Sequence, residues 1–296
     1  MANLVRAITR DGAAVITAIR STDLVAEAER IHKTSAVVTA ALGRLLTAGA
    51  MMGYLLKGER DSLTLQLKGD GPCGTLVVVA DSRGFVKGYA SQPVVELPLN
   101  SYGKLDVAGA VGRNGTFCVI RDTGGKEPYV GKTPIVSGEI AEDITHYYAT
   151  SEQTPTVCGL GVLVAPDLTV LQAGGFLLQL LPGAGEETIG QIERNLDGLP
   201  AVTQLLSDGV TPQDLCFRLL NGLTPELLDE ADCGWRCDCS RQRVERALIS
   251  LGREELLDMI AQQEPVELHC EFCGRSYTLR VDELRGLLES GQAPRA

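Results

Sequence analysis

Four cysteines near the C-terminus have the types and the spacing to do chemistry. Cys237 and Cys239 form a C-x-C pair, and Cys270 and Cys273 form a C-x-x-C pair after thirty intervening residues. Four thiolates that converge on one point are the ligand set of a tetrahedral zinc site. The same thiols can be oxidised. The sequence therefore predicts a metal site that is either a structural staple or a redox sensor.

The residues around the two pairs favour metal binding. Gly274 follows the C-x-x-C pair directly and would permit the tight turn of a zinc knuckle. Four arginines flank the thiols and should offset part of the site's negative charge, which would lower the thiol pKa values: Arg236, Arg241, Arg243 and Arg275. The alternative, two unrelated thiol pairs, requires both spacings to arise by coincidence.

The other five cysteines carry weaker predictions. Four stand singly among apolar or turn residues and are expected to be small buried side chains: Cys73, Cys118, Cys158 and Cys216. Cys233 lies four residues before Cys237, so it could compete as a ligand or form a disulfide after oxidation. His269 adjoins Cys270, and because sequence neighbours rarely bind the same ion, we expect it to take no part.

A search for catalytic residues returns little. His32 and His146 fall on predicted helices, and no G-x-S-x-G, P-loop or G-x-G-x-x-G sequence accompanies them. Catalytic zinc normally keeps an open coordination position, whereas four sulfurs close the shell. We therefore expect no catalytic residues and a protein that is not an enzyme.

Composition narrows the possible partners and the compartment. The 296 residues carry a formal net charge of −11, which argues against general affinity for nucleic acid or for anionic membranes. No secretory signal begins the chain, so a reducing cytoplasm is expected, where the cysteines should rest as thiols or metal ligands. The apolar segment Ala36–Leu56 has Arg44 in its middle and is predicted to be a buried core helix, in which Gly49 and Gly53 allow close approach.

The distribution of charge divides the chain into three parts. Residues 1–182 are almost balanced at −1 and are predicted to form an α+β core domain. Residues 183–232 carry 10 acidic and 2 basic side chains, a balance of −8, and are predicted to form a metastable helical linker, although composition alone leaves an ordinary ordered helical linker open. Residues 233–296 have a balance of −2 and should form a small zinc-binding domain. The fold class is therefore α+β, with a mixed or antiparallel sheet domain covered by helices.

Periodicity and turn signals place the elements of the first part. Asp11-Gly12 predicts a hairpin, and clustered strands favour a meandering sheet over a nucleotide-binding βαβ fold. Helices are predicted from Ser21 or Thr22 to Lys33 and, capped by Ser137, near Glu139–Thr150. The predicted strands are Leu4–Arg10, Ala13–Arg20, Leu63–Lys68, Thr75–Ala80, Phe85–Ala90, Thr116–Asp122, Val157–Ala165 and Thr169–Leu181.

The linker and the cysteine module have simpler patterns. Short helices broken by glycine and proline are predicted at Glu186–Leu196, Val202–Ser207, Gln213–Leu220 and Glu226–Ala231. Helices this short need docking to be ordered, and their leucines offer the contact: Leu205, Leu206, Leu215, Leu219, Leu220, Leu227 and Leu228. In the module, Arg243–Ile260 has a helical pattern, and Val266–Leu268 with Tyr277–Arg280 predicts a hairpin that carries the C-x-x-C pair.

Several sequence blocks resemble one family along nearly the whole chain. Cys237-Asp238-Cys239-Ser240 and Cys270-Glu271-Phe272-Cys273 resemble the redox switch of the thirty-three-kilodalton chaperonin family, the oxidation-activated heat-shock holdases of bacteria. Further blocks also resemble the family: Ala41–Leu46, Lys68–Pro72, Ser137–Asp143, Ser151–Pro155 and Ala173–Phe176. Cys73, Cys118 and Cys233 do not belong to the family pattern, which leaves side disulfides open.

The resemblance implies a redox-regulated chaperone with zinc as its cofactor, one ion per chain in the reduced form. Cys237, Cys239, Cys270 and Cys273 would be the ligands, and oxidation would pair Cys237 with Cys239 and Cys270 with Cys273. Loss of zinc would unfold the acidic linker and expose apolar surface to unfolded or partly unfolded client proteins, without ATP, under oxidative and heat stress. The resemblance further implies a homodimer when active.

Two other functions remain open at the level of sequence. A constitutive zinc-stapled module could contact RNA through its local arginines, although the net charge of the chain opposes this. A thiol–disulfide oxidoreductase could use the C-x-x-C pair, although the thioredoxin-like βαβ pattern is missing around it. Response to oxidant separates the three.

Overall fold

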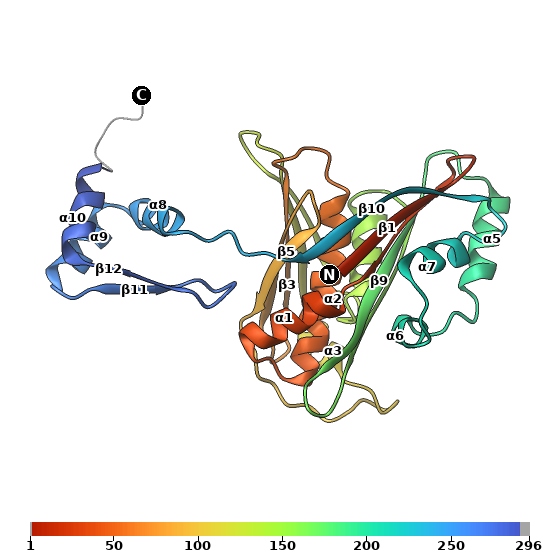
Figure 1. The fold of residues 1–296 in the computed structure, drawn as a ribbon, viewed down its shortest axis with the longest axis horizontal. Helices are drawn as coiled ribbons and strands as arrows, with labels where there is room; N and C mark the ends of the chain where they lie inside the picture. Colours follow the sequence, from red (N-terminus) through yellow and green to blue (C-terminus); the bar gives the residue numbers. More distant parts are fainter. Residues whose placement is uncertain (1, 291–296) are drawn as a thin grey trace. The chain divides into compact units, whose positions relative to one another are not determined.

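The computed structural model describes residues 2–290, which form the α+β fold that the sequence predicts (Figure 1). The chain divides into two compact units, one that ends at Arg236 and one that begins at Cys237. The acidic segment 183–232 belongs to the first unit, together with the sheet. The division therefore falls directly before the C-x-C pair.

A ten-stranded sheet forms the centre of the first unit, in the order β7-β6-β3-β4-β5-β10-β1-β2-β9-β8. Neighbouring strands are antiparallel except β5 and β10, which are parallel over only two residue pairs. All eight predicted strands are present with small shifts of their ends: β1 (Ala2–Thr9), β2 (Ala14–Arg20), β3 (Ser62–Gly69), β4 (Thr75–Asp81), β5 (Phe85–Ala90), β6 (Gly115–Asp122), β8 (Thr156–Val164) and β9 (Val170–Leu180).

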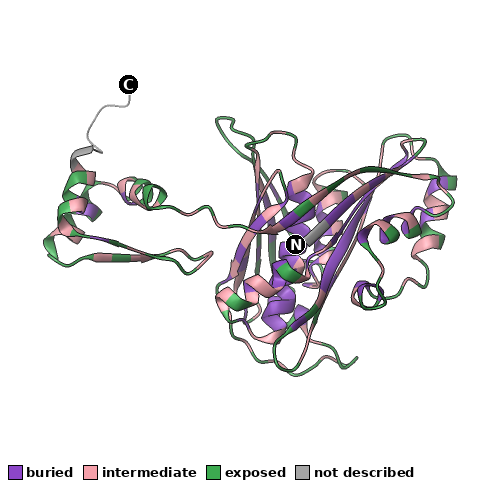
Figure 2. Cartoon of the chain, in the orientation of Figure 1, coloured by how far each residue is buried: buried purple, intermediate pink, exposed green. Residues whose placement is uncertain are grey.

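Helix α2 (Ala36–Tyr54) packs against both halves of this sheet and is buried along most of its length (Figure 2). It is long and apolar enough to cross a membrane, but 89% of its apolar window is buried inside the fold, as the core-helix prediction requires. A Cβ atom on Gly49 would lie 2.7 Å from Val78 Cγ1, and one on Gly53 would lie 2.7 Å from Ala80 Cβ. The two glycines therefore let the helix approach β4 closely, as predicted.

The remaining elements of the core domain include two that the sequence did not indicate. Helix α1 (Thr22–His32) is present as predicted. Helix α3 (Val107–Val111) is only five residues long and strand β7 (Tyr129–Pro134) lies at the sheet edge, so neither produces a clear periodic pattern.

Helix α4 (Ala141–Thr150) forms, but the cap predicted at Ser137 is wrong. The buried carboxylate of Asp143 accepts the backbone N–H groups of Val136, Gly138 and Ile140 at 2.7–3.1 Å. A charged acceptor in the first turn satisfies several otherwise unpaired donors at once, which a hydroxyl cannot do.

Three helices of the acidic segment dock on the outer face of the sheet: α5 (Glu186–Leu196), α6 (Val202–Ser207) and α7 (Pro212–Leu219). Their leucines pack with Val5, Ala7 and Ile16 in a second core, separate from the one around α2. The predicted docking residues Leu205, Leu206, Leu215, Leu219 and Leu220 are all buried. The order of these short helices therefore comes from the sheet beneath them.

The helix predicted at Glu226–Ala231 is wrong, because this segment is part of strand β10 (Pro225–Trp235). β10 pairs with β1 from Ala2↔Cys233 to Thr9↔Pro225, with a bulge opposite Arg6/Ala7. Leu227 and Leu228, which were expected to dock, are each 45% exposed. Pairing with a neighbouring strand has here overridden the local helical preference of the leucine-rich and acidic sequence.

The C-terminal unit is small and has a core of four buried leucines: Leu248, Leu256, Leu279 and Leu284. The predicted helical stretch forms two helices, α8 (Arg241–Leu251) and α9 (Arg253–Ala261), because Gly252 between them adopts φ +103°. The predicted hairpin is confirmed as β11 (Val266–His269) and β12 (Ser276–Leu279). Helix α10 (Val281–Ser290) follows.

Candidate metal centre

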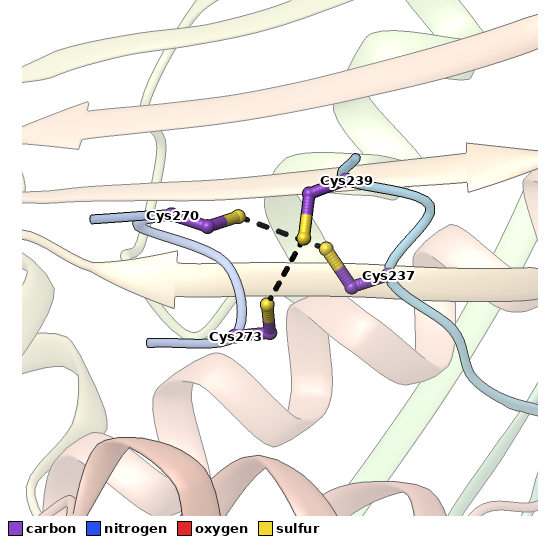
Figure 3. A group of neighbouring side chains, drawn as sticks. All are labelled: Cys237, Cys239, Cys270 and Cys273. Atoms are coloured by element: carbon purple, nitrogen blue, oxygen red, sulfur yellow. Dashed lines mark hydrogen bonds between the residues drawn. The ribbon is translucent and has the colours of Figure 1, made fainter. Parts of the chain in front are cut away.

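The four cysteines of the two pairs come together in the C-terminal unit. Cys237 and Cys239 lie in the segment that precedes α8, and Cys270 and Cys273 lie in the turn between β11 and β12 (Figure 3). All four Sγ atoms lie within 4.8 Å of one another, with hydrogen-bonded contacts of 3.4 Å between Cys239 and Cys273 and 3.7 Å between Cys237 and Cys270. The sequence prediction that the pairs meet is confirmed, while their role as ligands stays a prediction.

The hairpin turn positions the C-x-x-C pair through its backbone. The N–H of Cys270 donates to the carbonyl of Arg275 at 2.9 Å, and the N–H groups of Cys273 and Gly274 donate to the carbonyl of Cys270 at 3.2 and 2.8 Å. Gly274 adopts φ +69°, the left-handed conformation that glycine reaches without steric cost. The predicted tight turn at Gly274 is therefore present.

The sulfur separations fit a tetrahedral metal site. With zinc–sulfur bonds of about 2.3 Å, tetrahedral geometry separates the ligand sulfurs by about 3.8 Å. The contacts of 3.7 Å between Cys237 and Cys270 and 3.4 Å between Cys239 and Cys273 lie just below this value. The donor set contains only sulfur, which suits soft or borderline metals such as zinc and does not suit magnesium or calcium.

The pKa values of the clustered thiols are also consistent with a cation-binding site. Burial raises the pKa of Cys237 and of Cys273. Burial likewise raises the pKa of Cys239, but hydrogen bonds from Tyr277 and the neighbouring thiols outweigh it and lower that pKa to about 7. Adjacent thiolates repel one another, so full ionisation of the cluster would need a nearby cation. A divalent cation would allow all four to ionise.

Tyr277 is a residue of the site that sequence reasoning missed. It lies on β12, and its hydroxyl donates to Cys239 Sγ at 3.0 Å. Hydrogen bonds of this kind orient a metal ligand and hold its charge. The available signal was an aromatic residue four positions after Cys273, on the same predicted hairpin.

The flanking arginines only partly fulfil their predicted role. Arg241 pairs with Glu283 at 2.6 Å and Arg243 pairs with Asp238 at 2.5 Å, so carboxylates neutralise both. The Arg236 guanidinium lies over the ring of Phe85, 5.3 Å from its centroid. Arg275 does interact with the site, because a hydrogen bond with Tyr277 and then the charges of Tyr277 and of the Cys239 and Cys273 thiols raise its pKa.

The other cysteines are buried or half-buried, as expected for small apolar side chains. Burial raises the pKa of Cys73 to about 11 and those of Cys158, Cys216 and Cys233 to about 12. Cys233 lies in β10 of the first unit, outside the four-sulfur cluster. His269 also stands outside that cluster, and its Nδ1 bonds the hydroxyl of Ser276 at 2.9 Å.

Known proteins resemble this chain over nearly its whole length. The family model described as "Hsp33 protein" matches residues 2–280. A 33 kDa chaperonin of Ruminiclostridium cellulolyticum is 46% identical over 97% of both chains, and one of Acetivibrio thermocellus is 48% identical over 97% of this chain and 96% of its own. The crystal structure of a 33 kDa chaperonin from Thermotoga maritima matches with a TM-score of 0.88 at 36% identity and covers 97% of this chain and 98% of its own.

Proposed function

This chain belongs to the Hsp33 family, and we propose that it is a chaperone that binds unfolding proteins once its four clustered thiols have been oxidised. The observation that carries the proposal is the convergence of all four sulfurs within 4.8 Å. Relatives that cover nearly the whole chain are named 33 kDa chaperonin, which supports a chaperone over an enzyme.

In the reduced state, Cys237, Cys239, Cys270 and Cys273 would hold one zinc ion per chain. The all-sulfur donor set and the spacing of the sulfurs support this assignment. Bound zinc would neutralise thiolate charge and contribute on the order of 10 kcal/mol to the folding of a unit this small. The four thiolates would then tie the start of the C-terminal unit to its hairpin.

Oxidation would remove the ligands. Each disulfide forms when two thiols give two electrons and two protons to one molecule of peroxide, which is reduced to two molecules of water. The family implies the pairs Cys237–Cys239 and Cys270–Cys273, although the sulfur separations permit other pairings as well. Thiolates are the form of cysteine that binds metal, so the cross-link between the two segments would be lost with them.

Loss of the metal site would in turn destabilise the acidic segment 183–232, which we propose is a metastable linker. It leads, through Cys233 to Arg236, directly to the first ligand. Its balance of −8 opposes compaction, and its docked leucines would become a surface for unfolded clients when it loosens. Capture by apolar surface needs no ATP.

The remaining properties follow from composition and family. We propose a cytoplasmic protein that is not an enzyme, dimerises when active, and binds neither nucleic acid nor membranes. The net charge of −11 supports the absence of binding to nucleic acid and to membranes, because this charge would repel anionic partners.

The test compares zinc-loaded, reduced protein with the same sample after peroxide and heat. We expect zinc release, proteolytic cleavage within 183–232 and suppression of client aggregation to appear together. Equal suppression in reduced and oxidised samples would contradict the proposal. Steady turnover of disulfides would favour an oxidoreductase instead, and RNA binding that ignores oxidant would favour a constitutive module.

A further inference from the structure

Strand β10 occupies an unusual position for a segment that leads to a metal site. It lies between β5 and β1 in the ten-stranded sheet, and only Arg236 separates its last residue from Cys237. Its contact with β5 is limited to the pairs Gly234↔Phe85 and Trp235↔Val86, so nearly all of its pairing is with β1. Release of β10 would therefore leave β1 as a free sheet edge.

β10 is held mainly through its backbone. Of its eleven residues only Cys233 is buried, and Leu227 and Leu228 remain 45% exposed. Two ion pairs with side-chain exposures of 26–70% add little: Arg6 with Asp229 at 3.2 Å and Arg10 with Glu226 at 2.8 Å. The core contacts of β10 are at its end, where Cys233 and Trp235 pack with the core around α2. Residues 225–232 have few buried apolar contacts, and such a segment opens at low free energy.

The neighbouring strand β1, unlike β10, has buried apolar side chains on both of its faces. Leu4 belongs to the core around α2, whereas Val5 and Ala7 belong to the core under α5–α7, and each is at most 1% exposed. The core around α2 contains no residue of α5–α7, so it would still support β1 from one face when β10 and the acidic segment loosen. The edge that remains would be apolar, extended and rigidly backed.

The hydrogen-bonding direction of β1 is also fixed by the structure. The N–H of Arg10 donates to the carbonyl of Thr224, in the residue before β10, at 3.1 Å. Because N–H groups alternate sides along a strand, those of Leu4, Arg6 and Ile8 point towards β10. Those of Val5 and Ala7 point towards β2.

We propose that the β1 edge over residues 4–10 is a client-binding surface, on which an extended segment of an unfolding protein adds as a strand in the place of β10. The inference rests on the proposed function and specifies how clients are held. β10 itself shows what fits the edge: an extended chain recognised through its backbone, with little demand on its side chains. Such recognition tolerates many sequences, as a partner for unfolded proteins must.

Amide hydrogen exchange, read residue by residue in the full chain, tests the proposal. After peroxide treatment, the amides of Leu4, Arg6 and Ile8 should lose protection, and an unfolded client should restore it. The amides of Val5 and Ala7, bonded to β2, should stay protected throughout and serve as the internal control.

A pair of proline variants tests the pairing without oxidant. Ala231 pairs with Leu4 at a position where the β10 N–H faces β1, whereas Glu230 pairs with Val5 and its N–H faces away. Reduced, zinc-loaded Ala231→Pro should suppress client aggregation, and its Cys233 should react with a thiol reagent while Cys216 stays unreactive. Glu230→Pro should behave as the unmodified chain does.

Each other outcome rejects a distinct claim. Suppose that oxidised protein suppresses aggregation, but the amides of Leu4, Arg6 and Ile8 stay protected from exchange in the absence of client, or stay unprotected in its presence. Strand addition is then wrong, and the proposed function stands. Return of protection without client, in proportion to protein concentration, would mean that a second copy takes the edge. Equal behaviour of the two proline variants would also overturn the proposal. No suppression in any sample would defeat the proposed function itself.

Discussion

The single hydrogen bond from Tyr277 to Cys239 distinguishes one sulfur from its three neighbours. Two pairs of thiols became one cluster because short backbone segments fix each pair locally, the Gly274 turn in one case and the start of α8 in the other. At this scale the chemistry is set by donor type and charge. The first predictions therefore concern individual side chains.

Tyr277→Phe should weaken metal binding. The change removes a donor to a ligand sulfur, and loss of such a partner costs about 10–100-fold in metal affinity. Competition with a chromogenic chelator measures the effect. Tyr102→Phe is the matched control, because Tyr102 is 85% exposed and lies in the other unit, and it should leave the affinity unchanged. Equal affinities for both variants would remove Tyr277 from the site.

Metal affinity should rise with pH through the neutral range. Burial raises the pKa of Cys237 and Cys273, so the metal-free cluster holds protons at neutral pH that binding must displace. Acidification from about pH 8 to about pH 6 should therefore loosen binding and alkalinisation should tighten it. Calorimetric titration in buffers of different ionisation enthalpy counts the released protons. A pH-independent affinity would show that the thiols are not the ligands.

At the scale of elements, the helices α5–α7 depend on contacts with the sheet for their order. Their apolar side chains form one side of the second core, and apolar side chains of β1, β2 and β9 form the other side. Short helices of this kind have little stability of their own. Docking contacts should therefore set how readily the segment loosens.

Leu215→Ala should lower the free energy of unfolding of the first unit by about 2–5 kcal/mol, because the smaller side chain leaves a cavity at a buried position in the second core. Leu227→Ala, at a residue that is 45% exposed, should change it by less than about 0.5 kcal/mol. Denaturant titration measures both. We also expect oxidised Leu215→Ala to become active at a lower temperature. Similar losses in both variants would mean that α7 is not anchored by its leucines.

At the scale of the whole molecule, the two units differ in how they are stabilised. The first has two apolar cores on opposite faces of a ten-stranded sheet. The second has four buried leucines and the sulfur cluster. A unit with so small a core normally needs a metal or disulfides to remain folded.

Removal of metal by a chelator under reducing conditions should therefore unfold the C-terminal unit selectively. Amide exchange should show α8, α9 and the β11–β12 hairpin losing protection while α2 and its strands keep theirs. Serine at both Cys270 and Cys273 should give the same pattern without chelator, and Cys73→Ser, outside the cluster, should not. Retention of a folded C-terminal unit in the chelated sample would show that its apolar core suffices alone.

Sequence alone determined the local and the repetitive features of this protein. The cysteine spacings, the Asp11-Gly12 hairpin, the core helix around Arg44 and the leucines of α5–α7 are signals carried by neighbouring residues, and the structure confirms them. Their physical origin is short-range: turn conformation, helical period and side-chain type.

The tertiary structure decided what depends on partners distant in the chain. β10 is a strand because β1, more than two hundred residues earlier, offers it a ladder of backbone hydrogen bonds. Glu283 pairs with Arg241, one of the arginines expected at the sulfurs, and these two meet only after folding. Asp143 and Asp238, by contrast, bond groups only a few residues away. Propensities of a few tenths of a kcal/mol per residue yield to such contacts.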